Sequence, residues 1–184
     1  MKPTTITVAL LSCLVITGHA VAAAERPHEH GALKLDVAID GRQLLISMEA
    51  PLDNLLGFER APRSAAERQA AAELLARLRS PNQGRPLFAT DAAAQCVLSH
   101  VELNSPALAP AQNAASQAAG SHEHADLDAS YEFSCAQPQH LRQLALGLFE
   151  AYPRIQRIDV QIAGPAGQSK LTLKRPARSV ALTR

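Results

Sequence analysis

Residues 31–50, GALKLDVAIDGRQLLISMEA, decide the fold. Asp40 and Gly41 form a strong tight-turn pair at the centre of this stretch, and an apolar run over residues 43–50 follows it. Alternation of apolar and polar side chains is the period of a strand with one buried face. The stretch therefore predicts a β-hairpin. Apolar side chains stand at every second position of its first half: Leu33, Leu35, Val37 and Ile39.

The hairpin is followed by signals for helical structure. Pro51 ends the second strand, and residues 53–57, DNLLG, are typical of a short helical turn that ends on a glycine. Ser64 and Glu67 have the spacing of a capping box, which predicts a helix running to about Arg79. This helix has one apolar stripe, made of Ala70, Ala71, Leu74, Leu75 and Leu78.

Two strands and a segment of low complexity come next. Residues 94–104 and 126–135 are predicted strands, and the uncharged residues 105–121 between them are predicted to form a flexible loop. An antiparallel register that sets Cys96 opposite Cys135 also sets His100 opposite Tyr131. The buried face of the second strand is predicted to consist of Leu127, Ala129, Tyr131, Phe133 and Cys135.

The last part of the chain predicts a second helix and a terminal hairpin. Pro138 suits the first turn of a helix, and Pro153 closes it. Strands around residues 158–162 and 171–173 flank a Gly-Pro-Ala-Gly turn. The element order predicts an α+β domain: a mainly antiparallel sheet with two helices packed on it. The second helix has an apolar stripe at helical spacing, made of Leu141, Leu144, Ala145, Leu148, Phe149 and Tyr152.

The first 24 residues predict a cleaved export signal. Lys2 gives a positive start, residues 6–16 are apolar, and small alanines lead to a cleavage site after Ala24, with Ala22 as the alternative. A lipoprotein acylated at Cys13 is disfavoured because the apolar run continues beyond that residue. Cleavage leaves residues 25–184 as a single exported domain.

Composition excludes several classes of function. The 184 residues include 18 basic and 17 acidic side chains, a balance that argues against nucleic-acid binding. No apolar run after the signal reaches the roughly 18 residues of a membrane span. Cys96 and Cys135 are the cysteines that remain after cleavage, and in an oxidising compartment they predict one disulfide.

Four histidines form two matching clusters, which indicate a metal site. The clusters are His28-Glu29-His30 and His122-Glu123-His124. Residues two apart on an extended chain project from the same side. Imidazole suits zinc, copper and nickel, whereas calcium and magnesium prefer oxygen ligands. Because one cluster gives two ligands, either both clusters converge on one Zn²⁺ ion or one recruits a carboxylate such as Asp126 or Glu123.

Nothing in the sequence indicates catalysis. There is no HExxH motif, and there is no GxSxG nucleophile turn. The chain is therefore expected not to be an enzyme. Three alternatives to zinc binding stay open: a copper or nickel carrier using the same residues, an exported scaffolding or binding domain without a metal, and a metal-dependent hydrolase with a closed pocket.

Four motifs follow one another along the mature sequence: HEHG at 28–31, APLDNLLGFERAP at 50–62, HEHADLDASYEFSC at 122–135 and LFEAYP at 148–153. Together they resemble the ZrgA-like family of periplasmic zinc-uptake proteins. The resemblance implies a periplasmic α+β protein that binds zinc through histidines and assists a zinc ABC importer or its binding protein. It would carry His28, His30, His122 and His124 as candidate ligands.

The sequence departs from the family pattern in two places. The segment before the second cluster is often rich in histidine and acidic residues in the family, whereas here it contains alanine and glutamine. One or two sites are therefore expected rather than a high-capacity zinc store. The family's GFE motif is often followed by histidine, but Arg60 stands there in this chain, and a permanently charged guanidinium cannot be a metal ligand.

Overall fold

The computed structural model describes residues 29–109 and 125–183. Several sequence-based predictions lie outside the described residues and are not tested by the structure. These are the export signal over residues 1–24 with Cys13, the part of the predicted loop from 110 to 121, and the histidines His28, His122 and His124.

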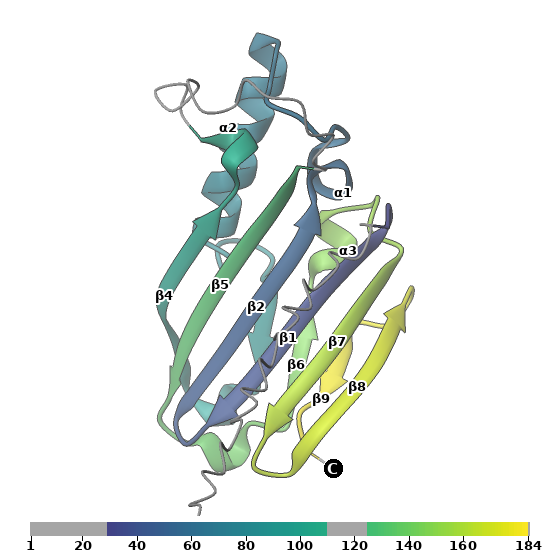
Figure 1. The fold of residues 1–184 in the computed structure, drawn as a ribbon. Helices are drawn as coiled ribbons and strands as arrows, with labels where there is room; N and C mark the ends of the chain where they lie inside the picture. The colour runs from purple at the N-terminus through teal and green to yellow at the C-terminus, as the bar shows by residue number, and fades with distance from the viewer. Residues whose placement is uncertain (1–28, 110–124, 184) are drawn as a thin grey trace, which may run out of the picture.

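A six-stranded sheet in the order β4-β5-β2-β1-β7-β8 is the largest element of the fold (Figure 1). Every neighbouring pair is antiparallel except β1 and β7, which run parallel. The α+β fold with a mainly antiparallel sheet is thus confirmed. The strands are β1 (Ala32–Asp40), β2 (Gln43–Pro51), β4 (Cys96–Asn104), β5 (Asp126–Cys135), β7 (Arg157–Gly164) and β8 (Gly167–Lys174).

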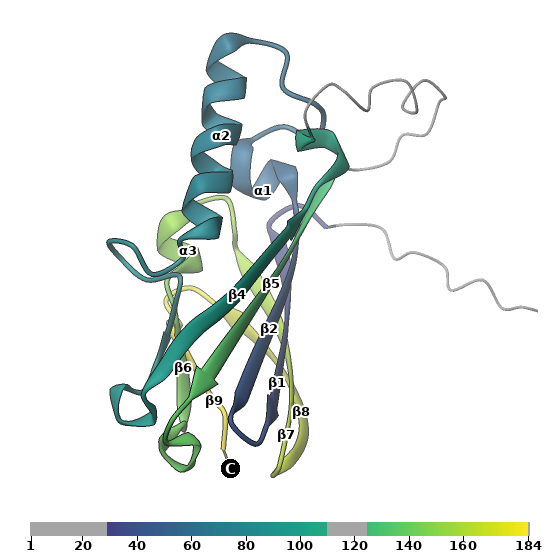
Figure 2. The ribbon, with the colours of Figure 1, turned by 90° about the vertical axis from the view of Figure 1, so that its left-hand side faces the viewer.

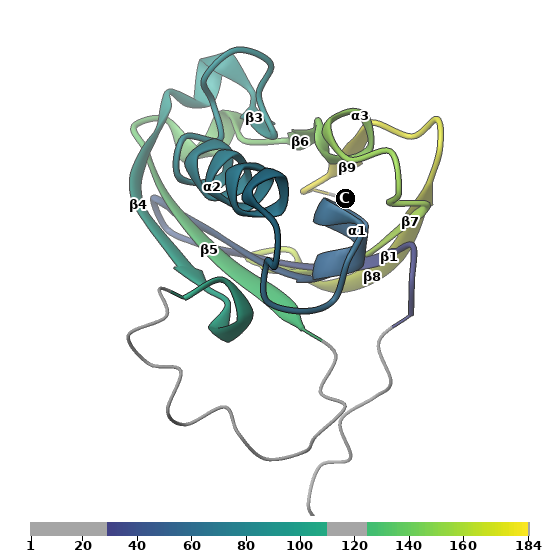
Figure 3. The same ribbon diagram turned by 90° about the horizontal axis from the view of Figure 1, so that it is seen from above.

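One face of this sheet is covered by a second layer, and the core lies between them. Figures 2 and 3 show α2 (Ala65–Arg79), α3 (Leu148–Ala151) and a three-stranded sheet on that side, and no helix or strand of residues 29–109 and 125–183 covers the opposite face, called here the open face. The small sheet has the order β3-β6-β9 and consists of β3 (Phe88–Thr90), β6 (Gln143–Leu146) and β9 (Ser179–Ala181). The helix α1 (Leu52–Leu56) directly follows β2. The described residues also form the 3₁₀ turns η1 (Ala92–Ala94), η2 (Pro106–Leu108) and η4 (Pro138–His140).

Several local predictions are confirmed. Both hairpins form, and Gly41 takes the positive φ of 54° that the first turn requires. The capping box at the start of α2 is present, because the Ser64 hydroxyl accepts from the Glu67 N–H and the Glu67 carboxylate accepts from the Ser64 N–H. The predicted inward face of β5 is buried throughout. The buried stripe of α2 is Ala71, Leu74 and Leu78.

The predicted helix over residues 138–152 is wrong. The segment forms η4, then β6, and then a helix α3 of only four residues. Its leucines also fit a period of two, and in β6 both Leu144 and Leu146 are buried. The segment forms a strand because β6 pairs with β3 and β9. Each of these partner strands has only three residues, too few for a sequence pattern that would predict the pairing. The adjoining Gly147 lies so close to the backbone of Pro86 that a side chain would not fit.

The predicted pairing of the two cysteine strands is confirmed at one end and wrong at the other. Cys96 pairs with Cys135 in a disulfide, and Leu98 lies opposite Phe133 as expected. A bulge between Leu98 and His100 then shifts the register, so that His100 lies opposite Glu132 rather than Tyr131. The extra residue is Ser99, whose hydroxyl donates to the Glu132 carbonyl at 2.9 Å. His100 is therefore exposed and not on the buried face.

Within the described ranges, no helix combines the length and apolar character needed to cross a bilayer.

Candidate functional site

The helix α1 connects the starts of two strands that follow the histidine clusters in sequence. The N–H of Leu52, its first residue, donates to the Ala125 carbonyl just before β5 at 2.8 Å. Two residues later the Asn54 amide donates to the Ala32 carbonyl at 2.6 Å, at the start of β1. A five-residue helix therefore holds both chain segments at one end of the large sheet.

The register of the sheet places these two starts at the same level. Lys34, Glu49 and Asp128 lie side by side across β1, β2 and β5. Two residues further toward the same end, Asp126 lies opposite Pro51, and Ala32 is at the matching position of β1. With one strand between them, the backbones of β1 and β5 are about 10 Å apart. Each HEH cluster ends two residues before one of these positions in the sequence.

His30 is the predicted ligand that the structure describes most fully. Its Nε2 lies 2.9 Å from Oε1 of Glu59, and the two side chains are 61% and 18% exposed. The imidazole is thus open to solvent on one side and contacts a largely covered carboxylate on the other. Glu59 reaches this position because Gly57, with a φ of 85°, ends α1 in the left-handed conformation and turns the chain back.

The backbone beside His30 is fixed from two sides. On the α1 side, the Gly31 N–H donates to Oδ1 of Asn54 at 2.7 Å, and Asn54 is only 1% exposed. On the β7 side, the N–H groups of Gln156 and Arg157 donate to the Gly31 carbonyl at 2.8 and 2.9 Å. His30 therefore extends from a well-anchored segment.

Glu29, the middle residue of the first cluster, points to a different partner. Both its carboxylate oxygens accept from the Arg157 guanidinium, at 3.0 and 2.8 Å. These hydrogen bonds hold the pKa of Glu29 below its usual range. Arg157 also donates to Asp159 at 3.0 Å, which links the first cluster to β7.

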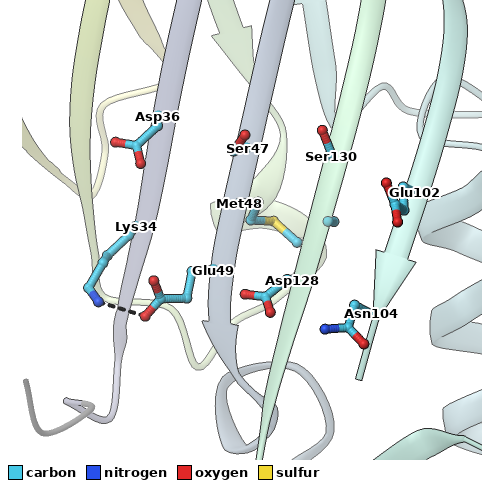
Figure 4. A pocket seen from close by; sticks show the side chains of 10 residues that line it. Lys34, Asp36, Ser47, Met48, Glu49, Glu102, Asn104, Asp128 and Ser130 are labelled. Atoms are coloured by element: carbon cyan, nitrogen blue, oxygen red, sulfur yellow. Dashed lines mark hydrogen bonds and ion pairs between the residues drawn. The ribbon is translucent and has the colours of Figure 1, made fainter. Parts of the chain in front are cut away.

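Asp126, the predicted carboxylate ligand, is the first residue of β5 and is half-buried. Its backbone carbonyl accepts from the Ser105 hydroxyl at 2.7 Å. Asp128 is exposed, as expected for the solvent side of the strand. It lines a shallow cavity of about 340 Å³ on the open face of the large sheet, where Lys34 and Glu49 form an ion pair at 2.6 Å (Figure 4).

The structure brings some of the predicted ligands to one region and leaves others untested. His30 and Asp126 belong to the same end of the large sheet, whereas His28, His122 and His124 lie outside the described residues. Among residues 29–109 and 125–183, no three histidine, cysteine, aspartate or glutamate side chains are grouped as a metal site. His100 and His140 are exposed on other parts of the molecule.

A family comparison covers this region and nearly all of the fold. The family model described as ZrgA family zinc uptake protein matches residues 27–182. The chain belongs to the ZrgA family of zinc uptake proteins. No curated protein matches it. In this ZrgA protein, Arg60 has a structural partner, because its guanidinium donates to both carboxylate oxygens of Glu67 at 3.0 and 2.8 Å and lies over the Phe58 ring.

Sequence reasoning missed two residues that contact the segment around His30. Asn54 and Glu59 were included only in turns, yet both contact the segment that carries His30. One signal was available for Asn54, because an amide among the leucines of residues 52–56 needs a hydrogen-bond partner if that turn is buried. No local pattern predicts the contact of Glu59, which depends on the path of the chain after Gly57.

Proposed function

We propose that this ZrgA protein is a periplasmic zinc-binding accessory protein that holds its cargo ion through His28, His30, His122 and His124. Asp126 is the candidate carboxylate at the same end of the sheet. The protein passes the ion to a zinc ABC importer and catalyses no reaction itself. The family membership supports the zinc-uptake role, and the disulfide is compatible with an exported protein.

One observation carries the ligand assignment: α1 bonds the starts of both β1 and β5. The two strands begin at one level, about 10 Å apart, with only β2 between them. Each cluster is joined to its strand by very few residues. Donors attached to neighbouring anchored points can close around one ion at a lower entropic cost than donors on unrelated parts of the chain.

The chemistry of the donor set favours a transition metal. Neutral imidazole is a good ligand for Zn²⁺, and four nitrogen donors, or three with one carboxylate, complete a tetrahedron. Binding requires unprotonated imidazoles, so zinc affinity is expected to fall as pH drops through the range in which histidines titrate.

Zinc calorimetry on the mature protein tests this assignment. The variant His28/His30/His122/His124→Ala is expected to lose binding, while the control His100/His140→Ala, which removes two exposed histidines elsewhere, is expected to keep it. Unchanged zinc binding in the fourfold variant would exclude these ligands. Tighter binding of Cu²⁺ or Ni²⁺ in competition, together with copper or nickel in the untagged purified protein, would identify a different cargo.

Paired variants decide whether the clusters share one ion. If they do, His28/His30→Ala and His122/His124→Ala each abolish binding at a stoichiometry of one. Two independent sites would instead leave each variant with half of the wild-type stoichiometry. The role in import is tested by growth in zinc-limited medium, where the fourfold variant should fail to complement a deletion of the gene and the His100/His140 control should succeed.

A further inference from the structure

We infer that residues 174–178, with the sequence Lys-Arg-Pro-Ala-Arg, form a docking surface for an acidic, extended segment of a partner protein. These residues lead from β8 to β9 and are called here the basic turn. The inference goes beyond the proposed function, because none of the residues that carry it is a candidate zinc ligand.

Carboxylates do not balance the positive charges of the basic turn. Lys174, Arg175 and Arg178 are all exposed, and none of them forms an ion pair with any residue in the ranges 29–109 and 125–183. Arg157, which lies opposite Lys174 on the neighbouring strand, shows the contrast, because its guanidinium is bonded to two carboxylates. The basic turn is therefore a local concentration of uncompensated positive charge.

The backbone of the basic turn is fixed at both ends. The Ala177 N–H donates to the Lys174 carbonyl at 2.9 Å, which closes the turn. The Leu146 N–H, in β6, donates to the Arg178 carbonyl at 2.7 Å. Figure 3 shows the chain passing beside α3 on its way from β8 to β9. The basic side chains thus extend from a defined loop.

The main chain around α3 also fixes the orientation of the Arg175 guanidinium. Its Nε donates to the Ile155 carbonyl at 3.2 Å. Its Nη2 donates to the carbonyls of Phe149, Tyr152 and Pro153 at 2.6, 3.3 and 3.1 Å. Within the described residues Nη1 has no hydrogen-bond partner, so its N–H groups can bind a carboxylate. Because the guanidinium is already oriented, it loses little conformational entropy when that carboxylate binds.

Two cavities adjoin each other at Arg175. The first has a volume of about 370 Å³, and its lining includes Pro153, Pro176 and Arg178. The second has a volume of about 390 Å³, and its lining includes Lys174. A ligand that crosses both cavities therefore contacts all three uncompensated cations and also the apolar surface of the prolines.

The open shape of the first cavity favours a protein segment over a small molecule. Pro153 and Pro176 are exposed, so a small ligand between them would leave much of its surface in water. Small-molecule sites usually bury about 70–90% of their ligand. An extended peptide makes contacts in both cavities, and its alternate side chains project from the same side. Acidic residues at alternate positions therefore match the charge of the basic turn.

A membrane surface fits the basic turn less well. Segments that bind anionic lipids usually contain about 4–8 lysines and arginines, whereas the basic turn contains three. A flat bilayer also cannot enter the cavities on either side of Arg175, although a peptide can. The number of charges and the shape thus both favour a protein partner.

Fluorescence anisotropy with a labelled peptide tests the inference. The probe is an end-blocked octapeptide of alternating glutamate and alanine, and the control peptide has glutamine in place of glutamate. A chelator is present throughout, so the result does not depend on zinc. We expect the mature protein to bind the glutamate peptide at least about 10-fold more tightly than the glutamine peptide. Binding should weaken as salt is added, because the charges are exposed.

Two double variants show where the peptide binds. Lys174/Arg178→Gln should weaken binding of the glutamate peptide by about 5- to 20-fold. The control Arg63/Arg79→Gln removes two exposed positive charges at the ends of α2 and should stay within about twofold of the wild type. Since both variants change the net charge equally, a difference between them reports the location of the site. Arg175 is kept because its bonds to carbonyls support the fold.

Three outcomes would overturn the inference. The first is an affinity of Lys174/Arg178→Gln for the glutamate peptide equal to that of the wild type or of the control variant. The second is a wild-type protein that binds neither peptide. The third is binding to phosphatidylserine vesicles, lost in Lys174/Arg178→Gln, by a protein that does not bind the glutamate peptide, which would assign the basic turn to a membrane surface. The zinc assignment is measured separately and stands or falls independently of these results.

Discussion

Asn54 forms hydrogen bonds with the main chain of two successive residues, Gly31 and Ala32. Its Oδ1 accepts from the Gly31 N–H at 2.7 Å, and its Nδ2 donates to the Ala32 carbonyl at 2.6 Å. With 1% of its surface exposed, Asn54 is the one buried polar residue among the described parts of the chain. An amide provides one donor and one acceptor at this spacing, so the side chain replaces the strand partner that this end of β1 would otherwise need.

Substitution of Asn54 should therefore affect both stability and zinc binding. Asn54→Ala removes the partner of the Gly31 N–H and of the Ala32 carbonyl, both partly buried, and we expect a loss of about 2–4 kcal/mol in the free energy of unfolding. Asn54→Asp keeps the acceptor for Gly31 but sets a carboxylate oxygen against the Ala32 carbonyl, so it should also destabilise. Zinc affinity should fall in both variants, because the segment that carries His30 is released.

Urea unfolding followed by circular dichroism measures the stability change, with Asn82→Ala, an exposed loop substitution, as the control. A variant at position 54 that is as stable as the control would show that these two hydrogen bonds contribute nothing to the anchor.

The parts of the fold that the sequence predicts are those in which neighbouring residues determine the structure. Period-two alternation in β1 and β5, the apolar run of β2 and the capping box of α2 are local signals, and each is confirmed. The parallel pairing of β1 with β7 joins residues about 125 apart in sequence, and nothing in either strand specifies its partner. The bulge at Ser99 has no residue signature, which is why His100 was placed on the wrong face.

The residues of the candidate site show the same difference between local sequence signals and long-range contacts. Histidine clusters are visible in a sequence because ligand chemistry depends on residue type and short spacing. Asn54 and Glu59 lie more than 20 residues from the segment that they hold, and their roles arise only once α1 folds beside the start of β1. Residues that contact a candidate ligand from a distant part of the chain are therefore harder to predict than the candidate ligands themselves.

Glu67 should make the free energy of unfolding depend on pH in the acidic range. Hydrogen bonds from the Arg60 guanidinium, and then from the N–H groups of Arg63 and Ser64, lower the pKa of Glu67 from 4.5 to about 2. A carboxyl group with a lowered pKa in the folded state stabilises that state above its unfolded pKa and loses this contribution as pH falls toward the folded pKa. The stabilisation should thus be complete above about pH 5 and disappear near pH 2.

Urea unfolding at several pH values between 7 and 2 tests this dependence. Wild-type stability should fall more steeply below pH 5 than that of Glu67→Gln, which keeps the shape of the capping box and cannot ionise. The control Glu73→Gln alters an exposed carboxylate on the same helix. Parallel curves for the wild type and Glu67→Gln would contradict the assignment.

The two tyrosines should resist ionisation in the folded protein. Burial raises the pKa of Tyr152 to about 12 and that of Tyr131 further, and neither hydroxyl has a hydrogen-bond partner within the described residues. The unfolded chain ionises near pH 10, so stability should decline as pH rises from about 10 to 12. Since the chain has two tyrosines and no tryptophan, tyrosinate absorbance reports only these groups.

Alkaline titration of the native protein is expected to show no tyrosinate at pH 10, whereas in urea both tyrosines should be half-ionised there. Tyr152→Phe leaves Tyr131 as the only signal and assigns the two transitions. One full equivalent of tyrosinate in the native protein at pH 10 would show that at least one hydroxyl is solvated.

Gly147 distinguishes the observed strand β6 from the helix that the sequence alone predicts for this segment. In a helix interior, Gly147→Ala would stabilise the protein by about 1 kcal/mol, because alanine is the better helix former. In the structure, an alanine Cβ would collide with the Pro86 carbonyl oxygen, and the Gly147 N–H donates to the Leu87 carbonyl at 2.9 Å. Relieving the collision requires a shift of backbone that is held by the small sheet, so we expect a destabilisation of about 1–3 kcal/mol.

The helical and the strand structure of this segment therefore predict opposite changes in the free energy of unfolding for Gly147→Ala. Urea unfolding measures the sign of that change directly. Gly164→Ala is the matched control: its Cβ would lie 3.5 Å from Ile39, an ordinary contact, and its backbone is outside the left-handed region. That variant should change the free energy of unfolding by less than about 0.5 kcal/mol. A stabilised Gly147→Ala would mean that residues 143–151 are helical and that the small sheet lacks its central strand.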